Sequence, residues 1–206
     1  MAAAATNIVL PFLLVLFVHL SFGLVLSEAK LDGNTTLSVL LEVKRSFVED
    51  PEKVLNAWSE SNPNFCTWRG VSCGLDSVDG SVQVVGLNLS DSSLTGSISP
   101  SLGSLQNLLH LDLSSNGLTG PIPPALSNLS SLESLLLFSN QFSGPIPTQL
   151  GSLVSLRVMR IGDNELTGHI PASFGNLVNW SLLVWPHAVS TVQYHPNLAD
   201  SANSRI

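Results

Sequence analysis

Apolar residues recur through the middle of the chain with a period of 24 residues. Three copies of the pattern follow one another without a gap, at Leu105–Asn128, Leu129–Ser152 and Leu153–Asn176. Within each copy, leucines alternate with other residues as they do in a β-strand that buries one face. A unit this short cannot bury its apolar face alone, so the copies are predicted to stack. The pattern therefore predicts an α/β solenoid, a horseshoe fragment with a parallel sheet on its concave side.

Two polar or small positions are also fixed in every copy, and both serve the turn after the strand. An asparagine side chain can bond backbone groups inside this turn, copy upon copy, and a glycine permits a left-handed backbone. The asparagines are Asn116, Asn140 and Asn164, and the glycines are Gly120, Gly144 and Gly168. Replacing Asn140 with alanine is expected to cost about 1–3 kcal/mol, because backbone groups lose their partners.

The pattern weakens at both ends of the array. An imperfect copy at Val82–Ser104 precedes the three, with Ser92 in place of the asparagine, as is typical of a terminal repeat. A fifth copy opens at Leu177, and we expect one strand within Ser181–Trp185. From Pro186 to Ile206 the repeat frame is lost, and this segment is predicted to be irregular.

A different pattern before the repeats predicts a helical cap. Apolar residues trace one face of a helix from about Thr36 to Val48, and Asp50-Pro51 has the form of a second helix start. The chain's two cysteines, Cys66 and Cys73, lack the C-x-x-C spacing of a redox or zinc site. We expect a disulfide that contributes about 2.5 kcal/mol. Two free buried thiols are the alternative.

These motifs together resemble the start of the ectodomain of plant leucine-rich-repeat receptor-like kinases, and are most similar to the GASSHO subfamily. The resemblance rests on the order of a helix, a tryptophan, a C-x-W-x-G-V-x-C motif and L-x-x-N-x-L-x-G-x-I-P repeats. It implies a protein-binding module that perceives peptide hormones at the cell surface. It also implies a secreted peptide or protein as ligand and a co-receptor kinase ectodomain as a possible second partner.

The N-terminus and the sequons predict the compartment. An apolar run from Ile8 to Leu26 predicts a secretory signal peptide, with an uncleaved signal anchor as the alternative. N-glycosylation sequons, which fit a secreted or cell-surface chain, stand at Asn34, Asn88, Asn128 and Asn179. The predicted organisation is a signal peptide at 1–27, a cap at 31–81, repeats at 82–185 and a tail at 186–206.

The outward positions of the predicted strands are the candidate recognition surface. They are Gly86, Asn88, Ser90, His110, Asp112, Ser114, Ser134, Leu136, Phe138, Val158, Arg160 and Gly162. Leu136 and Phe138 form the one apolar spot, with Arg160 beside Leu136 in the next repeat. Exposed apolar residues in such a column can mark a binding site, and drift among repeats is the alternative.

Composition and motif content argue against other classes of function. Charged residues make up 11% of the chain, the net charge is −7, and the few basic residues are scattered, which disfavours nucleic-acid binding. No catalytic or nucleotide-binding motif occurs, and the histidines lack metal-ligand spacing, so no cofactor and no metal are expected. His110, Asp112 and Ser114 are expected to point the same way along one strand, unable to meet as a triad. Asp76, Asp79 and Gly80 predict a turn instead of a calcium loop.

Three functional hypotheses remain. The first is a truncated product of a receptor-kinase gene, since no kinase signature is found in the sequence. The second is a short secreted binding module that acts as a decoy or scaffold. The third is a secreted inhibitor resembling the polygalacturonase-inhibiting proteins, which share the repeat type and the cap.

Overall fold

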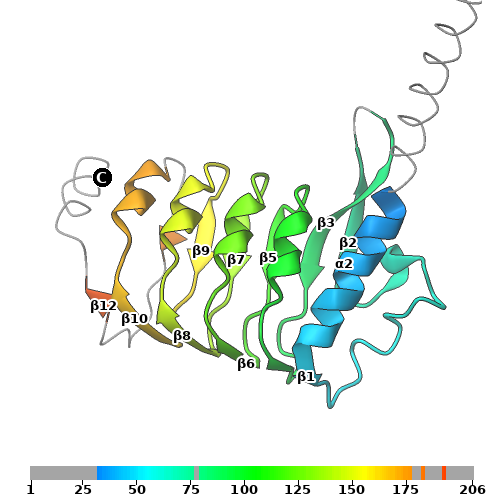
Figure 1. Cartoon of the computed structure of the whole chain (residues 1–206), viewed down its shortest axis with the longest axis horizontal. Helices are drawn as coiled ribbons and strands as arrows, with labels where there is room; N and C mark the ends of the chain where they lie inside the picture. Colours follow the sequence, from blue (N-terminus) through cyan, green and yellow to red (C-terminus); the bar gives the residue numbers. More distant parts are fainter. Residues whose placement is uncertain (1–31, 77–78, 178–181, 184–191, 194–206) are drawn as a thin grey trace, which may run out of the picture. The chain divides into compact units, whose positions relative to one another are not determined.

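The computed structural model describes residues 32–76, 79–177, 182–183 and 192–193. The chain divides into two units, Met1–Thr36 and Leu37–Ile206. Each complete repeat contributes a strand, a turn, a second short strand and a 3-10 helix, in that order (Figure 1). Stacking places equivalent elements of successive repeats side by side, so the predicted solenoid fold is confirmed.

The first sheet is the predicted sheet of the repeats. Its order is β11-β9-β7-β5-β3-β2, and only β2 pairs antiparallel. The strands are β2 (Val71–Leu75), β3 (Val82–Asn88), β5 (His110–Asp112), β7 (Ser134–Leu136), β9 (Val158–Arg160) and β11 (Leu182–Leu183). Leu87, Leu111, Leu135 and Met159 lie opposite one another at the same register position, and all four are buried. This row of side chains is one layer of the core.

A second sheet, which the sequence analysis did not predict, follows the asparagine turns. Its order is β1-β4-β6-β8-β10-β12, with β1 antiparallel to β4 and the other pairs parallel. The strands are β1 (Phe47–Glu49), β4 (Thr95–Gly96), β6 (Gly117–Gly120), β8 (Gln141–Pro145), β10 (Glu165–His169) and β12 (Val192–Gln193). These segments are rich in glycine and small polar residues, so they carry no alternating apolar signal.

Four 3-10 helices, one per repeat, lie side by side along the array. They are η2 (Pro100–Ser104), η3 (Pro124–Asn128), η4 (Thr148–Ser152) and η5 (Ala172–Asn176). Each buries one large apolar side chain completely, at Leu102, Leu126, Leu150 and Phe174. In the first repeat the proline comes one position late, and the Ser99 hydroxyl caps the helix by accepting from the Ser101 N–H.

The asparagine side chains join neighbouring repeats. The Asn140 amide donates to Leu113 O of the preceding repeat at 2.9 Å and to Leu137 O of its own at 3.2 Å. Its Oδ1 accepts from the Leu118 N–H at 3.0 Å. Asn116 and Asn164 make the corresponding bonds. The turn role predicted for these residues is confirmed, and the bonds between repeats add a function that the sequence alone did not show.

A left-handed residue precedes each asparagine. Ser115, Ser139 and Asp163 have φ angles of 55°, 56° and 50°. The glycines four residues after the asparagines also have positive φ, between 78° and 86°. The positive φ of the glycines was predicted from their repetition. Nothing in the sequence predicted the same conformation for the two serines and the aspartate. A left-handed backbone costs a residue with a Cβ about 1–2 kcal/mol. The asparagine bonds therefore hold a backbone that the local sequence does not favour.

Ser92 stands where the first repeat lacks its asparagine. Its N–H and that of Leu94 both donate to Oδ1 of Asn116, and its own hydroxyl donates to Ser90 O. No earlier repeat lies beside it, since β4 pairs instead with β1 of the cap. A long amide side chain is therefore not needed at this position.

Two predictions for the cap are wrong in detail. The first helix, α2, runs from Asp32 to Ser46, and Phe47–Glu49 form β1, in which Val48 is exposed instead of lying on the apolar face. Asp50 starts a turn, not a helix, although its carboxylate accepts from two backbone N–H groups, as a cap residue does. Lys53 has a φ of 56°, which ends any helical path at this point.

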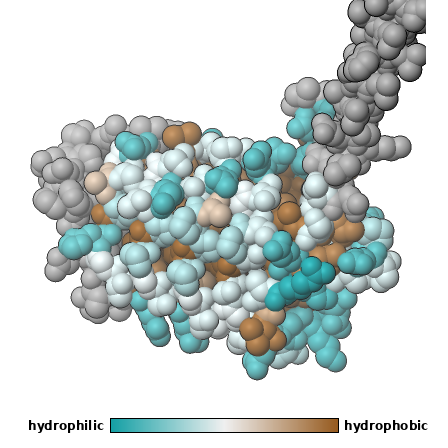
Figure 2. All heavy atoms as spheres, in the orientation of Figure 1, coloured by the Kyte–Doolittle hydropathy of each residue, from teal (hydrophilic) through white to brown (hydrophobic). Residues whose placement is uncertain are grey.

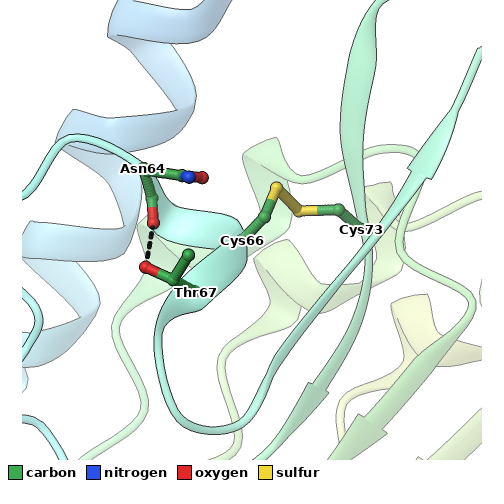
Figure 3. The surroundings of a disulfide bond; sticks show 4 residues. All are labelled: Asn64, Cys66, Thr67 and Cys73. Atoms are coloured by element: carbon green, nitrogen blue, oxygen red, sulfur yellow. Dashed lines mark hydrogen bonds between the residues drawn. A yellow bond between two sulfur atoms is a disulfide. The ribbon is translucent and has the colours of Figure 1, made fainter.

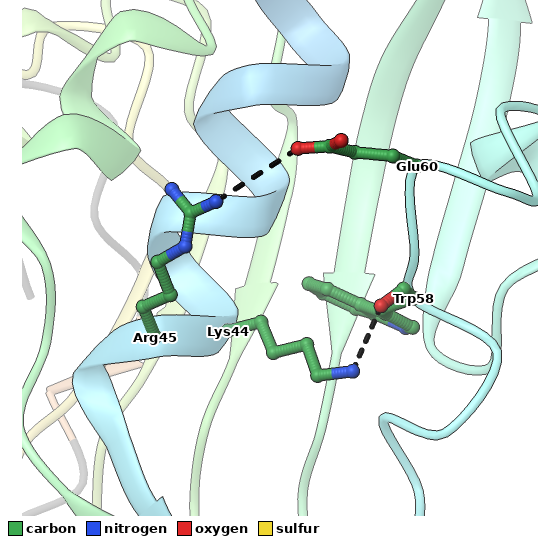
Figure 4. Close-up of polar contacts among 4 residues, drawn as sticks. All are labelled: Lys44, Arg45, Trp58 and Glu60. Carbon is green, nitrogen blue, oxygen red and sulfur yellow. Dashed lines mark hydrogen bonds and ion pairs between the residues drawn. The ribbon is translucent and has the colours of Figure 1, made fainter.

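The cap core is built on two stacked indoles and one lysine. The rings of Trp58 and Trp68 are 5.1 Å apart, and both side chains are buried. Lys44 extends from α2 beside Trp58 and donates to Trp58 O at 2.8 Å (Figure 4). It also donates to Leu55 O at 2.9 Å. Arg45, the next residue, faces Glu60 at 4.0 Å in an exposed ion pair. Lys44 thus fastens the helix to the loop that follows it.

The fifth repeat retains its backbone register beyond the point where the sequence pattern ends. Leu182 lies opposite Val158 and Val192 opposite Gly168, in each case one 24-residue period apart. The prediction of an irregular segment from Pro186 onward is therefore wrong at β12. Because a ladder bonds backbone groups, it tolerates the loss of the side-chain pattern. Trp180, Trp185 and most of the tail lie outside the described residues.

We predict that Asn140→Ala lowers the free energy of unfolding by about 1–3 kcal/mol, because buried backbone groups in two repeats lose their partners. Urea unfolding followed by circular dichroism measures this difference. Asn107→Ala, at an exposed position of the preceding repeat, is the matched control and is expected to change stability by less than about 0.5 kcal/mol. Equal effects of the two substitutions would show that the hydrogen bonds of the Asn140 side chain do not contribute this part of the free energy of unfolding.

We predict that Lys44→Met lowers the free energy of unfolding by about 1–3 kcal/mol, because two half-buried carbonyls lose a charged donor. Arg45→Met removes the same charge from the same helix, yet its exposed pair contributes at most about 0.5 kcal/mol. Thermal unfolding of both variants tests the contrast. A larger loss for the Arg45 variant would contradict the role given to Lys44.

Candidate functional site

The candidate surface is the outward face of the first sheet. Strand pairing places its residues in rows that cross the repeats. One row is Gly86, His110, Ser134 and Val158, and a second is Asn88, Asp112, Leu136 and Arg160. The structure thus brings residues that are far apart in the sequence into two lines on one face.

The first two repeats present a polar surface with internal bonds. His110 is exposed, whereas Asp112 is half-buried and accepts from the Ser114 hydroxyl at 2.6 Å and from the Ser114 N–H at 3.0 Å. Asn88 holds Ser90 in the same way. These bonds close the strand-to-turn corner, so part of each polar side chain serves the fold.

Three residues predicted to point outward are buried instead. Gly86 and Gly162 offer only backbone, and Ser114 is 3% exposed. His110, Asp112 and Ser114 were predicted to point the same way along one strand and not to meet as a triad, but Asp112 and Ser114 are hydrogen-bonded to each other. β5 ends at Asp112, so the backbone turns and carries Ser114 back over the carboxylate.

The third and fourth repeats present an apolar surface with one cation. Leu136, Phe138 and Arg160 are all half-buried. The guanidinium of Arg160 lies over the Phe138 ring, 4.1 Å from its centroid. Its Nε is buried and has no hydrogen-bond partner among the described residues. The position of Arg160 beside Leu136 was predicted from the sequence, whereas its contact with Phe138 was not.

The predicted disulfide is present. Cys66 in η1 (Phe65–Thr67) bonds Cys73 in β2, with a Cα–Cα distance of 5.6 Å (Figure 3). The Thr67 hydroxyl donates to Asn64 O at 2.7 Å and closes the short helix. The alternative of two free thiols is therefore excluded. The bond fastens the cap loop to the strand that begins the first sheet.

The acidic segment before β3 is a hairpin turn. The Gly80 N–H donates to Asp76 O, and hydrogen bonds from Ser81, first from its side chain and then from its backbone N–H, hold the pKa of Asp79 below its usual value. The turn predicted for these residues is confirmed. Within the described residues, no group of three acidic, histidine or cysteine side chains is placed to bind a metal ion, and no helix has the length and apolar content to cross a membrane.

On the side shown in Figure 2, the described residues form no large apolar patch. Hydrophobic residues appear there as separate small groups among hydrophilic ones. A shallow hollow of about 450 Å³ lies on the cap, lined by Leu41, Lys44, Arg45, Trp58 and Glu60. Lys44 is already engaged there with backbone carbonyls, so the hollow offers little chemistry of its own.

Family comparisons agree with the cap and repeats seen in the structure. Residues 34–74 match the leucine rich repeat N-terminal domain, and residues 83–142 and 155–177 match leucine rich repeats. The chain is 53% identical over 100 residues to the LRR receptor-like serine/threonine-protein kinase GSO2 of Arabidopsis thaliana, which covers 48% of this chain and 7% of that protein. The kinase GSO1 of the same plant is 58% identical over 79 residues, 37% of this chain and 6% of that protein. The chain thus spans less than a tenth of the length of these relatives.

Solved structures give the same answer. The ectodomain of the Arabidopsis thaliana receptor kinase GASSHO1/SCHENGEN3, crystallised with CASPARIAN STRIP INTEGRITY FACTOR 2, is 50% identical with a TM-score of 0.68. The match covers 78% of this chain and 18% of that one. The BIR3–SERK2 complex of the same plant matches at 32% identity and a TM-score of 0.63, over 76% of this chain and 80% of the other. The chain belongs to the leucine-rich-repeat family, with the N-terminal cap and repeats of plant receptor-kinase ectodomains.

Proposed function

We propose that this chain is an extracellular binding module that presents the outward face of its first sheet to a secreted peptide or protein, with a co-receptor kinase ectodomain as a possible second partner. The observation that carries the proposal is the 50% identity to the GASSHO1 ectodomain, which was crystallised with a peptide factor. A structure that contains SERK2, a partner of BIR3 in that complex, supports the second partner.

The candidate face suits binding better than catalysis. Its exposed groups include one histidine, and its carboxylate is held by Ser114 within the fold. Catalysis needs an activated nucleophile or a matched acid and base, and the geometry assembles neither here. We therefore propose a module without enzymatic activity.

The proposed organisation is a signal peptide at 1–27, a cap at 31–81, repeats at 82–185 and a tail at 186–206. Entry into the secretory pathway, followed by residence in the apoplast or at the cell surface, is supported by the disulfide, since such bonds persist in oxidising compartments. The ectodomain relatives support the same location.

We predict that the chain, secreted from plant cells, binds at least one of three analytes: the CASPARIAN STRIP INTEGRITY FACTOR 2 peptide, the SERK2 ectodomain or the BIR3 ectodomain. Ser134→Arg places a bulky cation in the middle of the face and is expected to weaken binding at least about tenfold. Thr148→Arg adds the same side chain to an exposed position of η4, outside the first sheet, and serves as the control. Biosensor titration measures both.

Equal effects of the two arginine substitutions would place the binding surface elsewhere. No binding to any analyte, combined with inhibition of a fungal polygalacturonase, would favour the inhibitor class over the receptor class. The full GASSHO1 ectodomain provides the positive control for the peptide.

We predict N-glycans at Asn88 and Asn128, since both residues are exposed. The side chain of Asn34 and all of Asn179 lie outside the described residues, and these two sequons remain predictions from sequence alone. Mass spectrometry of the secreted protein, before and after enzymatic deglycosylation, checks occupancy. Asn88→Gln and Asn128→Gln should each remove one glycan mass, and an unchanged mass would show that the sequon is not used.

A further inference from the structure

One row on the first sheet has an ordered sequence of chemical types. Asn88, Asp112, Leu136 and Arg160 lie opposite one another on adjacent strands, so the row runs from neutral to acidic to apolar to basic. Neighbouring strands are about 4.8 Å apart, which puts the Asp112 and Arg160 backbones about 10 Å apart with Leu136 between them. Opposite charges are therefore held in fixed positions on either side of an apolar side chain.

Arg160 lacks a partner for part of its guanidinium. Its Nε is buried without a hydrogen bond, and no carboxylate among the described residues pairs with it. By contrast, Arg45 and Arg157 each face a glutamate. The buried Nε is out of reach of a ligand, but the Nη groups of Arg160 form no ion pair among the described residues and can donate to an incoming carboxylate at two atoms.

Phe138 orients this cation. The ring lies under the guanidinium at 4.1 Å, which restricts the plane of the group and leaves its rim as the direction of approach. Leu136, half-buried beside it in the row, supplies an apolar surface at the same place. An incoming carboxylate on Arg160 would thus be accompanied by an apolar contact.

Asp112 has the complementary character. Both of its described hydrogen bonds, from the Ser114 N–H and hydroxyl, reach the same oxygen, Oδ1. The corner of the strand therefore fixes the carboxylate in orientation while it keeps a negative group on the face. A basic side chain is the natural partner for it.

We propose that this row binds an extended segment of a partner protein in which a basic, an apolar and an acidic residue occupy alternate positions. The acidic side chain lies on Arg160, the apolar one on Leu136 and the basic one on Asp112. Alternate residues of an extended chain point to one face about 6.6 Å apart, and the long charged side chains span the remaining mismatch with the strand spacing. The inference rests on the proposed function, since it specifies the chemistry of the partner that the same face takes.

The test uses beads that display blocked peptides at high density, so that weak binding becomes measurable. The parent peptide is Gly-Lys-Ser-Leu-Ser-Glu-Gly. In one comparison peptide Gln replaces Glu, in a second Gln replaces Lys, and in a third Ser replaces Leu. Retention of the fluorescently labelled secreted chain is measured at low and high salt. The parent is expected to retain about tenfold more protein than the Gln-for-Glu peptide, with the difference shrinking at high salt.

Substitutions in the protein assign the charges. Arg160→Gln should abolish the preference for Glu over Gln, whereas Arg157→Gln removes the same charge from an exposed site nearby and should preserve it. Asp112→Asn retains the Oδ1 acceptor for Ser114 and should abolish only the preference for Lys over Gln. Arg160→Lys retains the charge without the forked donor and should give an intermediate preference, which keeps the test decisive if the glutamine variant unfolds.

Two results would overturn the proposal: equal retention of the Glu and Gln peptides by the unsubstituted chain, or equal losses in the Arg160→Gln and Arg157→Gln variants. Neither result would affect the wider function, which depends on the Ser134→Arg and Thr148→Arg comparison. If Ser134→Arg and Thr148→Arg also had equal effects, both the proposed peptide pattern and the assignment of binding to the first sheet would be wrong.

Discussion

The rest of the structure depends on the need to satisfy backbone groups in the turn after each strand. Each turn of the four described repeats contains a left-handed residue that is not glycine, which local preference alone would not hold, and in all but the first an asparagine comes next. The asparagine that follows bonds its own turn and the strand end of the preceding repeat through one amide. The same side chain therefore fixes the turn and the spacing between repeats. Strand register, the second sheet and the row of buried leucines all follow from this spacing.

An array of this kind needs a partner for its first repeat, and the cap supplies one on both sheets. β2 adds to the first sheet and β1 to the second, in each case antiparallel. Antiparallel strands end the parallel ladder without needing another asparagine turn, which explains why Ser92 is sufficient there. The disulfide, the stacked indoles and Lys44 hold these two strands in place from different sides.

The outward face has two halves with different construction. In the first two repeats, Asn88 and Asp112 hold the serines that follow them, so polarity there serves both fold and surface. In the third and fourth repeats, those positions carry Leu136, Phe138 and Arg160, and the fold makes no comparable use of them. Side chains that make no hydrogen bonds within the strand-to-turn corner can be selected for binding without a loss of stability.

The sequence by itself determined the period, the buried leucines and the asparagine and glycine positions, because each of these recurs from copy to copy. It favoured a disulfide between Cys66 and Cys73 over two free thiols, and the structure decided between them. The sequence also predicted most of the outward residues of the first sheet correctly; Gly86, Ser114 and Gly162, which are buried, are the exceptions. Only the tertiary structure decided the second sheet, the strand in place of the end of the first helix, and the turn at Asp50. The same holds for the contact between Arg160 and Phe138, which are 22 residues apart in the chain. These features depend on backbone pairing and on contacts between repeats. The residues involved are brought together by the fold, and the sequence around each of them does not predict the contact.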